Sequence, residues 1–215
     1  MVLAHTYDFD VSLAITFDYG QQAAAQEISH AKKTAQYLGV PHRAVKIESL
    51  RELKSGGALL APNRRLPQPT LNQLSDGTFT MESAKAVWVP NRNGLFIETA
   101  AAIAEDMGAD AIIVGFNKEE AETFPDNSSD YLAAITHALS FSTSNQVKVL
   151  SPTAGFTKTQ IVETALEEGF PLKLLWSCYE GSPKMCGSCE SCMRLKRALK
   201  INGVSSNDLF ENACL

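Results

Sequence analysis

Four of the five cysteines in this 215-residue chain lie close together near the C-terminus, at Cys178, Cys186, Cys189 and Cys192. Two Cys-x-x-Cys steps share Cys189, so the last three thiolates can converge on one ion, and the loop after Cys178 can return the fourth. Gly187 permits the tight turn that this spacing needs. A tetrahedral set of four thiolates suits Zn²⁺ and leaves no open position, so the sequence predicts a structural zinc site.

Other interpretations of these cysteines remain open. Disulfides would need an oxidising compartment, whereas no apolar signal segment opens the sequence and the rest is typical of a cytoplasmic protein. Four thiolates also hold iron–sulfur clusters, and the spacing alone excludes neither such a cluster nor redox-active thiols. We interpret Cys214, one residue from the C-terminus, as lying outside the site.

The composition is that of a globular protein. Hydrophobic residues make up 45% and charged residues 20%, values that disordered or fibrous chains do not show. The length fits one sizeable domain with a small appendage. The longest apolar stretches fall far short of the roughly 20 residues that a bilayer-spanning helix requires. We therefore expect a cytoplasmic protein with no membrane partner.

The charge argues against a nucleic-acid partner. A formal net charge of −5 would repel phosphate backbones, so we expect no stable nucleic-acid complex. One basic run, RLKRALK at residues 194–200, stands apart from this balance. Such a run is typical of the solvated face of a helix.

Short apolar segments alternate with helical stripes along most of the chain. The predicted strands are residues 11–17, 42–47, 110–116 and 147–150, and the predicted helices are residues 24–38, 48–54, 95–107, 130–141 and 157–168. This order predicts an α/β fold, an open, mostly parallel, doubly wound sheet with helices on both faces. Residues 55–80 lack periodicity and carry several glycines and prolines, which predicts a long loop.

A ligand site in such a fold lies beyond the carboxyl ends of the strands. Four polar loops fall at these positions: residues 18–21, 90–93, 115–128 and 151–158. Arg92 and Asn93 open a predicted helix and could bind an anion beside its free N–H groups, although an ordinary cap by Asn91 or Asn93 is an equal alternative. Lys158 lies in a first helical turn, where a phosphate would offset its unfavourable position, or it simply faces solvent.

Carboxylates gather in the third of these loops, at Glu119, Glu120, Glu122 and Asp126. One of them could accept two hydrogen bonds from the N–H edge of a guanine-like base. Phe124 or Tyr19 would then offer a face for stacking. We expect most of the other carboxylates only to solvate the loop.

Five segments together resemble 7-cyano-7-deazaguanine synthase, a family in the ATP-pyrophosphatase (PP-loop) group. They are FDYGQ at residues 17–21, VPNRN at 89–93, GFN…FPD at 115–126, SPT…K at 151–158, and WSCYEGSPKMCGSCESC at 176–192. The resemblance covers nearly the whole chain, and the cysteine-rich motif is its most specific part. It implies an adenine nucleotide alpha hydrolase-like fold at residues 1–175, followed by a zinc-binding C-terminal segment at residues 176–215.

The resemblance also implies a reaction. In this family ATP, with Mg²⁺, adenylates 7-carboxy-7-deazaguanine, and ammonia displaces AMP to give an amide. A second ATP activates the amide, and loss of AMP leaves 7-cyano-7-deazaguanine, the nitrile precursor of queuosine and archaeosine in tRNA. The implied partners are the deazapurine, ATP and ammonia, with a second copy of the chain as a candidate partner in a homodimer.

Matching the motifs residue by residue implies a set of site residues. Arg92 and Lys158 are the catalytic candidates, and Asn93 and Asp126 are candidates for binding substrate or ATP. Tyr19, Gly20 and Gly115 complete the predicted binding set, because each lies in one of the four polar loops.

The chain departs from the family pattern in three places. PP-loop enzymes begin with a strand and Ser-Gly-Gly-x-Asp-Ser, whereas this sequence opens on residues that resemble the helix after that loop. We therefore expect an incomplete chain without the first, central strand. Bacterial members commonly carry Gly where this chain has Asn91, and Cys-Arg where it has Asn127 and Ser128.

Two alternative functions remain open, the first a related enzyme and the second from another class. A tRNA-thiolating PP-loop enzyme also carries Cys-x-x-Cys zinc knuckles, but this chain lacks an added RNA-binding domain and is acidic. The second alternative is a catalytically inactive zinc-binding module that docks a partner or nucleic acid through RLKRALK.

Overall fold

The computed structural model describes Ala4, Tyr7 and residues 9–53, 57–61, 63–205 and 207–211. Contacts between α-carbons divide these residues into two units. The middle-chain unit comprises Ala4, Tyr7 and residues 9–12 and 91–157, and the two-segment unit comprises the described parts of residues 13–90 and 158–211. Cys214 and most of the helix expected over the first residues fall outside the described part of the chain.

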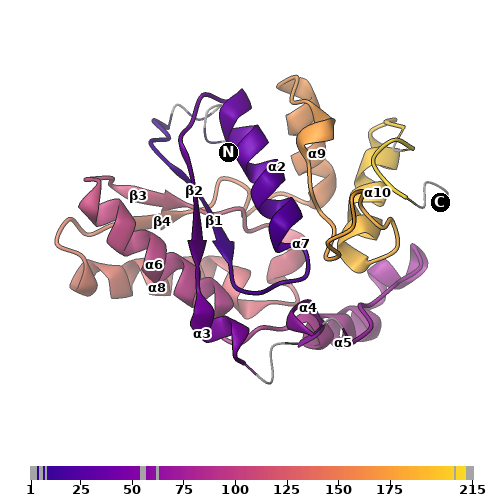
Figure 1. The fold of residues 1–215 in the computed structure, drawn as a ribbon, viewed down its shortest axis with the longest axis horizontal. Coiled ribbons are helices and arrows are strands. Elements are labelled where there is room, and N and C mark those ends of the chain that lie inside the picture. Colours follow the sequence, from indigo (N-terminus) through magenta and orange to yellow (C-terminus); the bar gives the residue numbers. More distant parts are fainter. Residues whose placement is uncertain are drawn as a thin grey trace. The chain divides into compact units, whose positions relative to one another are not determined.

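The two-segment unit begins with a strand–helix–strand unit (Figure 1). Strand β1 (Ala14–Asp18) pairs in parallel with β2 (His42–Lys46), with Ala14 opposite His42 and Asp18 opposite Lys46. Helix α2 (Ala24–Tyr37) connects them and packs against both strands. It ends before Gly39, whose φ of +71° is one that glycine adopts without strain. The predicted strands and helix are therefore confirmed, with β1 shorter than expected.

The rest of this unit is helical. Its elements are α3 (Glu48–Arg51), α4 (Gly57–Leu60), the 3₁₀ helix η1 (Asn72–Ser75), α5 (Gly77–Val87), α9 (Lys158–Glu167), the 3₁₀ helix η3 (Leu172–Leu174) and α10 (Glu190–Ile201). The prediction of a long loop over residues 55–80 is wrong for the part that forms α4, η1 and the start of α5. The missed signal is Asp76, whose side chain accepts hydrogen bonds from the N–H groups of Thr78 and Phe79 at 2.9 and 3.3 Å and so caps α5.

The middle-chain unit repeats the α/β pattern. Its elements are α6 (Arg92–Asp106), β3 (Ala111–Ile113), α7 (Lys118–Ala121), the 3₁₀ helix η2 (Pro125–Asn127), α8 (Ser129–Ser142) and β4 (Lys148–Leu150). Strands β3 and β4 are parallel, with Ala111 opposite Lys148 and Ile113 opposite Leu150. Helices α6 and α8 bury Ile97, Ala101 and Leu139 in one core with Phe116 and Val149. The predicted helices and strands of this unit are confirmed, and the loop at 117–128 also contains α7 and η2.

The described residues thus form a mixed α/β structure with parallel strand pairing, as predicted. Their strands form two two-stranded sheets, β1–β2 and β3–β4, instead of one continuous ladder. Strand β3 is shorter than the predicted 110–116 because its last pairing is the hydrogen bond from Val114 N–H to the Leu150 carbonyl at 2.9 Å, after which the chain leaves the sheet at Gly115. No helix in the described part of the chain is long and apolar enough to cross a membrane.

Candidate functional site

The four predicted metal ligands converge in the two-segment unit. The sulfur atoms of Cys178, Cys186, Cys189 and Cys192 all lie within 4.8 Å of one another, and all four residues are buried free cysteines. The Sγ atoms of Cys186 and Cys192 are 3.9 Å apart. Tetrahedral Zn–S bonds of about 2.3 Å would place sulfur atoms about 3.8 Å apart, so the spacing fits one shared ion.

Backbone N–H groups point at two of these sulfur atoms. Cys178 Sγ accepts hydrogen bonds from the N–H groups of Glu180 and Cys186 at 3.2 and 3.3 Å. Cys186 Sγ accepts from those of Ser188 and Cys189 at 3.5 and 3.3 Å. Gly187, at φ +74°, makes the turn that directs the N–H groups of Ser188 and Cys189 toward Cys186 Sγ. Donors of this kind stabilise thiolates over thiols.

The chemistry of the cluster also fits a cation. Hydrogen bonds with the thiol of Cys178, followed by those with Cys189 and Cys192, lower the pKa of Cys186 far below its ordinary value. Hydrogen bonds with Cys178, then Cys186 and Cys189, raise the pKa of Cys192 instead. A shared cation would let all four ionise. A four-iron cluster would hold the thiolates further apart than one ion does, so the geometry favours a single metal over iron–sulfur chemistry.

Helix α10, which carries Cys192, is joined to earlier segments of the chain through Glu190. Arg194 donates two hydrogen bonds, at 2.9 and 2.7 Å, to Oε1 of Glu190, and Ser83 of α5 donates to the other carboxylate oxygen. The N–H of Glu190 also donates to the Pro67 carbonyl at 3.1 Å. The loop and helix before residue 90 are thereby joined to the cysteine cluster.

The basic run on α10 is largely not a solvated face. Lys196 is 1% exposed, and its Nζ lies 5.1 Å from the centroid of the Phe210 ring. Arg194 is engaged by Glu190, whereas Lys200 is exposed as predicted. The interpretation of RLKRALK as a solvated face is therefore wrong for Lys196 and Arg194. The alternative that uses this run for docking loses support with it.

In the middle-chain unit, three of the predicted site residues meet at the start of α6. Asn91 occupies the N-cap position at φ +52° without a side-chain capping bond, and Arg92 and Asn93 begin the helix. The side chain of Asn93 is buried and donates to the backbone carbonyl of Asp126 at 3.4 Å. The charge of Arg92 acts on the Asp126 carboxyl.

The Asp126 carboxyl has contacts that the motif alone did not reveal. Asn127, itself buried, donates from Nδ2 to Asp126 Oδ1 at 3.2 Å. Burial raises the pKa of the Asp126 carboxyl, while the Arg92 charge and the Asn127 amide oppose that rise. Burial, followed by the charges of Asp126 and Glu98, raises the pKa of the Tyr131 phenol. Asn127 and Tyr131 are thus neighbours of the candidate carboxylate that sequence reasoning did not assign.

Gly115 is exposed at the carboxyl end of β3, and no atom lies within 4 Å of a Cβ built on it. The next residue, Phe116, is held in place by the loop that follows β4. The hydroxyls of Ser151 and Thr153 both donate to the Phe116 carbonyl, at 2.9 and 2.6 Å. Residues 151–153 of one predicted loop therefore meet the start of the predicted loop at 115–128 within this unit.

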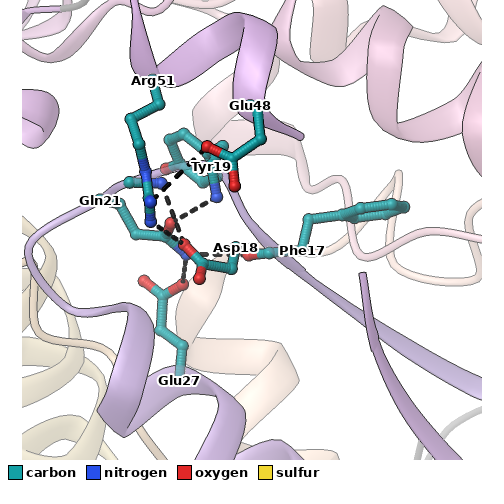
Figure 2. Close-up of polar contacts among 8 residues, drawn as sticks. Phe17, Asp18, Tyr19, Gln21, Glu27, Glu48 and Arg51 are labelled. Atoms are coloured by element: carbon teal, nitrogen blue, oxygen red, sulfur yellow. Dashed lines mark hydrogen bonds and ion pairs between the residues drawn. The ribbon is translucent and has the colours of Figure 1, made fainter. Parts of the chain in front are cut away.

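The loop after β1 is held by a polar network (Figure 2). Asp18 accepts hydrogen bonds from the Gly20 N–H at 3.1 Å and from Arg51 at 3.2 Å, and Gln21 joins the Phe17 carbonyl to Glu27 at 2.9 and 2.8 Å. Gly20 has a φ of +89°, and a Cβ there would lie 2.8 Å from Arg51 Cγ, so the turn requires glycine.

Tyr19 and Lys158, the other predicted site residues of the two-segment unit, lie in different settings. Tyr19 is buried, with its N–H bonded to Gln21 Oε1 at 3.0 Å (Figure 2). Lys158 is the first residue of α9, as predicted, and is partly exposed. The roles of both residues stay predictions.

The fold and the cysteine cluster define a mixed α/β protein with a tetrathiolate metal-type centre. A model of the family described as queuosine biosynthesis protein QueC matches residues 1–203. The chain belongs to this family. It is 46% identical over 202 residues to the 7-cyano-7-deazaguanine synthase of Methanosarcina barkeri, which covers 92% of this chain and 86% of that protein. It is 47% identical to the synthase of the same name from Carboxydothermus hydrogenoformans, over 89% of this chain and 87% of the relative.

Proposed function

We infer that this chain is a 7-cyano-7-deazaguanine synthase. The observation that carries this conclusion is the family match over residues 1–203, joined by relatives of that name at 42–47% identity along most of their length. The resemblance seen in the sequence motifs leads to the same activity.

The chemistry follows from the weakness of a carboxylate as an electrophile at neutral pH. ATP, with Mg²⁺, adenylates 7-carboxy-7-deazaguanine and releases pyrophosphate, and ammonia then displaces AMP. A second ATP activates the amide, and loss of AMP leaves the nitrile. The protein contributes by aligning the reactants, by countering phosphate charge with cations and by excluding water that would hydrolyse the acyl-adenylate.

The proposed residue roles follow from charge and hydrogen-bonding capacity. Arg92 and Lys158 act on phosphate groups, each from the first turn of a helix. Asp126 accepts the N–H edge of the deazapurine, and Asn93 supports the backbone at Asp126. Tyr19, Gly20 and Gly115 supply further contacts to substrate or ATP.

The finer structural assignments are also proposals. The cysteine cluster binds one structural Zn²⁺, supported by its closed tetrathiolate geometry. Family membership supports one doubly wound sheet of the adenine nucleotide alpha hydrolase-like type over residues 1–175, with a zinc-binding segment at 176–215. A cytoplasmic location and a homodimer also remain proposals.

The direct test is to incubate the purified chain with 7-carboxy-7-deazaguanine, ATP, Mg²⁺ and ammonia. Mass spectrometry should detect 7-cyano-7-deazaguanine, with two AMP formed per nitrile. Omitting ammonia should abolish the nitrile. Folded, metal-loaded protein that binds ATP but forms neither nitrile nor amide would contradict the assignment.

A further inference from the structure

The Asp126 carboxylate is fixed by two buried amides. Asn127 donates from Nδ2 to Oδ1 at 3.2 Å, and Asn93 donates to the backbone carbonyl of Asp126 at 3.4 Å. Both amide side chains are only 6% exposed. Asn127 therefore holds the carboxylate at Oδ1, while Asn93 holds the backbone that carries it and also helps to lower the pKa of the carboxyl.

The turn that presents this pair is itself fixed by local hydrogen bonds. The N–H of Asn127 donates to the Phe124 carbonyl at 2.9 Å. The hydroxyl of Ser128 donates to the Pro125 carbonyl at 2.7 Å and accepts from the N–H of Tyr131 at 3.1 Å, which caps α8. The backbone at residues 125–128 therefore has little freedom, and the carboxylate of Asp126 is prepositioned.

A carboxylate has four lone-pair directions, and Asn127 uses one of them at 3.2 Å. Hydrogen bonds from the Asp126 backbone and the Asn93 side chain also lower the pKa of the carboxyl. The rest of the group can accept the two adjacent N–H donors of a guanine-type edge. A base without the 2-amino group would leave part of a half-buried carboxylate unpaired, which is unfavourable. The orientation of the carboxylate therefore decides how strongly these bases are distinguished.

We propose that Asn127 is a positioning residue for substrate selection: by holding Oδ1 of Asp126, it aims the carboxylate at the ring N–H and 2-amino groups of a guanine-type base. This inference rests on the proposed function. It assigns a role to a residue at which the chain departs from the Cys of the bacterial motif.

The informative change is Asn127→Asp, which is nearly isosteric but replaces the donor with a second carboxylate. Two adjacent carboxylates disfavour ionisation of both, so the acidic limb of kcat/KM should move to higher pH. The KM for 7-carboxy-7-deazaguanine should rise about 10- to 100-fold, as expected for losing a hydrogen bond to a charged group, while the KM for ATP stays unchanged. The preference over the analogue lacking the 2-amino group should shrink.

Asn145→Asp is the matched control. Asn145 is exposed and donates from Nδ2 to the Ala109 carbonyl at 3.0 Å, so this change also removes an amide donor. Ala109 and Asn145 precede β3 and β4, whereas Gly115 and Ser151 follow them, so the control lies at the opposite end of the strand pair. Its KM values, base preference and pH profile should match those of the unmodified chain.

Equilibrium binding of 7-carboxy-7-deazaguanine and its 2-deamino analogue separates this inference from the proposed function, because binding needs no turnover. Asn127→Ala, which adds no charge, serves if Asn127→Asp does not fold, and it should also weaken selective binding. Nitrile formation with unchanged base preference in either folded Asn127 variant would overturn the inference and leave the function standing. If the unmodified chain binds the two bases selectively but forms no nitrile, the proposed function is overturned and the inference about Asn127 is left standing. Binding that does not distinguish the two bases in the unmodified chain would also overturn the inference.

Discussion

Ser83 and Glu190, which lie 107 positions apart in the sequence, share a buried hydrogen bond between the Ser83 hydroxyl and Oε2 of Glu190. The other oxygen of Glu190 is occupied by Arg194. Glu190 lies between the third and fourth cysteines of the cluster. This contact therefore couples α5 to the metal-type centre.

Removing Glu190 should be costly because its partner Arg194 is only 13% exposed. Glu190→Ala is expected to lower the free energy of unfolding by about 3 kcal/mol, since it removes the carboxylate that accepts two hydrogen bonds from the largely buried Arg194 and one from Ser83. Ser83→Ala should cost about 1 kcal/mol. Urea unfolding measures both, and the exposed neighbour Glu82→Ala should stay within about 0.5 kcal/mol of the unmodified chain. If Glu82→Ala and Glu190→Ala lowered the free energy of unfolding equally, the buried ion pair between Glu190 and Arg194 would be contradicted.

Lys196 should stabilise the fold through its stem as well as its charge. Lys196→Ala is expected to cost about 3 kcal/mol because it opens a cavity in the core, whereas Lys196→Met should cost less than about 2 kcal/mol because it keeps the packing and loses the contact with Phe210. Thermal unfolding gives the ranking. Lys200→Met, at an exposed position of the same helix, is the control and should have little effect. Indistinguishable unfolding of all three variants would show that Lys196 is not buried in solution.

Loss of one metal ligand should remove both the ion and the fold of the C-terminal region. Cys189→Ser is expected to reduce zinc from about one to near zero per chain by elemental analysis, together with lower thermal stability. Cys214→Ser removes a thiol that lies outside the predicted ligand set, so it should keep its zinc. A Cys189→Ser protein that retains full zinc and stability would exclude this metal site.

Asn91 and Gly94 constrain each other. Asn91 has a φ of +52°, and a Cβ added at Gly94 would collide with the side-chain oxygen of Asn91. Gly94→Ala, which in most helices gains about 1 kcal/mol, should therefore destabilise this chain. In an Asn91→Gly background, which removes the obstructing side chain and suits positive φ, the same change should become stabilising. A double-mutant cycle by urea unfolding measures the reversal, and additive effects would disprove the contact.

Asp126 should cost stability when it is ionised. Burial raises its pKa in the folded state above the unfolded value, so the folded chain binds the proton at higher pH than the unfolded chain does. The loss of stability due to the ionised carboxylate is complete above the pKa of the folded state. It fades as the pH falls toward the pKa of the unfolded state, about 4. Asp126→Asn should therefore be more stable than the unmodified chain at pH 7, with a smaller difference at pH 4, and should lose nitrile formation.

Asp130→Asn provides the comparison for this pH dependence. Asp130 is exposed in the first turn of α8, where its charge favours the helix, so its removal should cost a few tenths of a kcal/mol. Guanidinium unfolding across pH 4–8 would separate the two cases. A loss of stability in Asp126→Asn at pH 7 would show that the partners of Asp126 outweigh its burial.

The sequence by itself determined the cysteine set, the order of strands and helices and the family. Metal-ligand spacing and hydrophobic periodicity are local properties, so they can be recognised before the chain is folded. Arg92, Asn93 and Asp126 were predictable as candidates because they follow strands or open a helix. Residues 77–80 were missed because an Asp76 cap is a weak signal in a segment rich in glycine and proline.

Only the tertiary structure decided which polar residues are buried and with what partners. Lys196 belongs to a basic run that composition assigns to solvent, yet it is buried, with its Nζ over the Phe210 ring. Ser83 and Glu190, and likewise Asn93 and Asp126, come together through packing between distant segments. The tertiary structure also buries the Asn127 amide beside its sequence neighbour Asp126. Burial sets the strength of a charge or hydrogen bond, and it depends on how the whole chain folds.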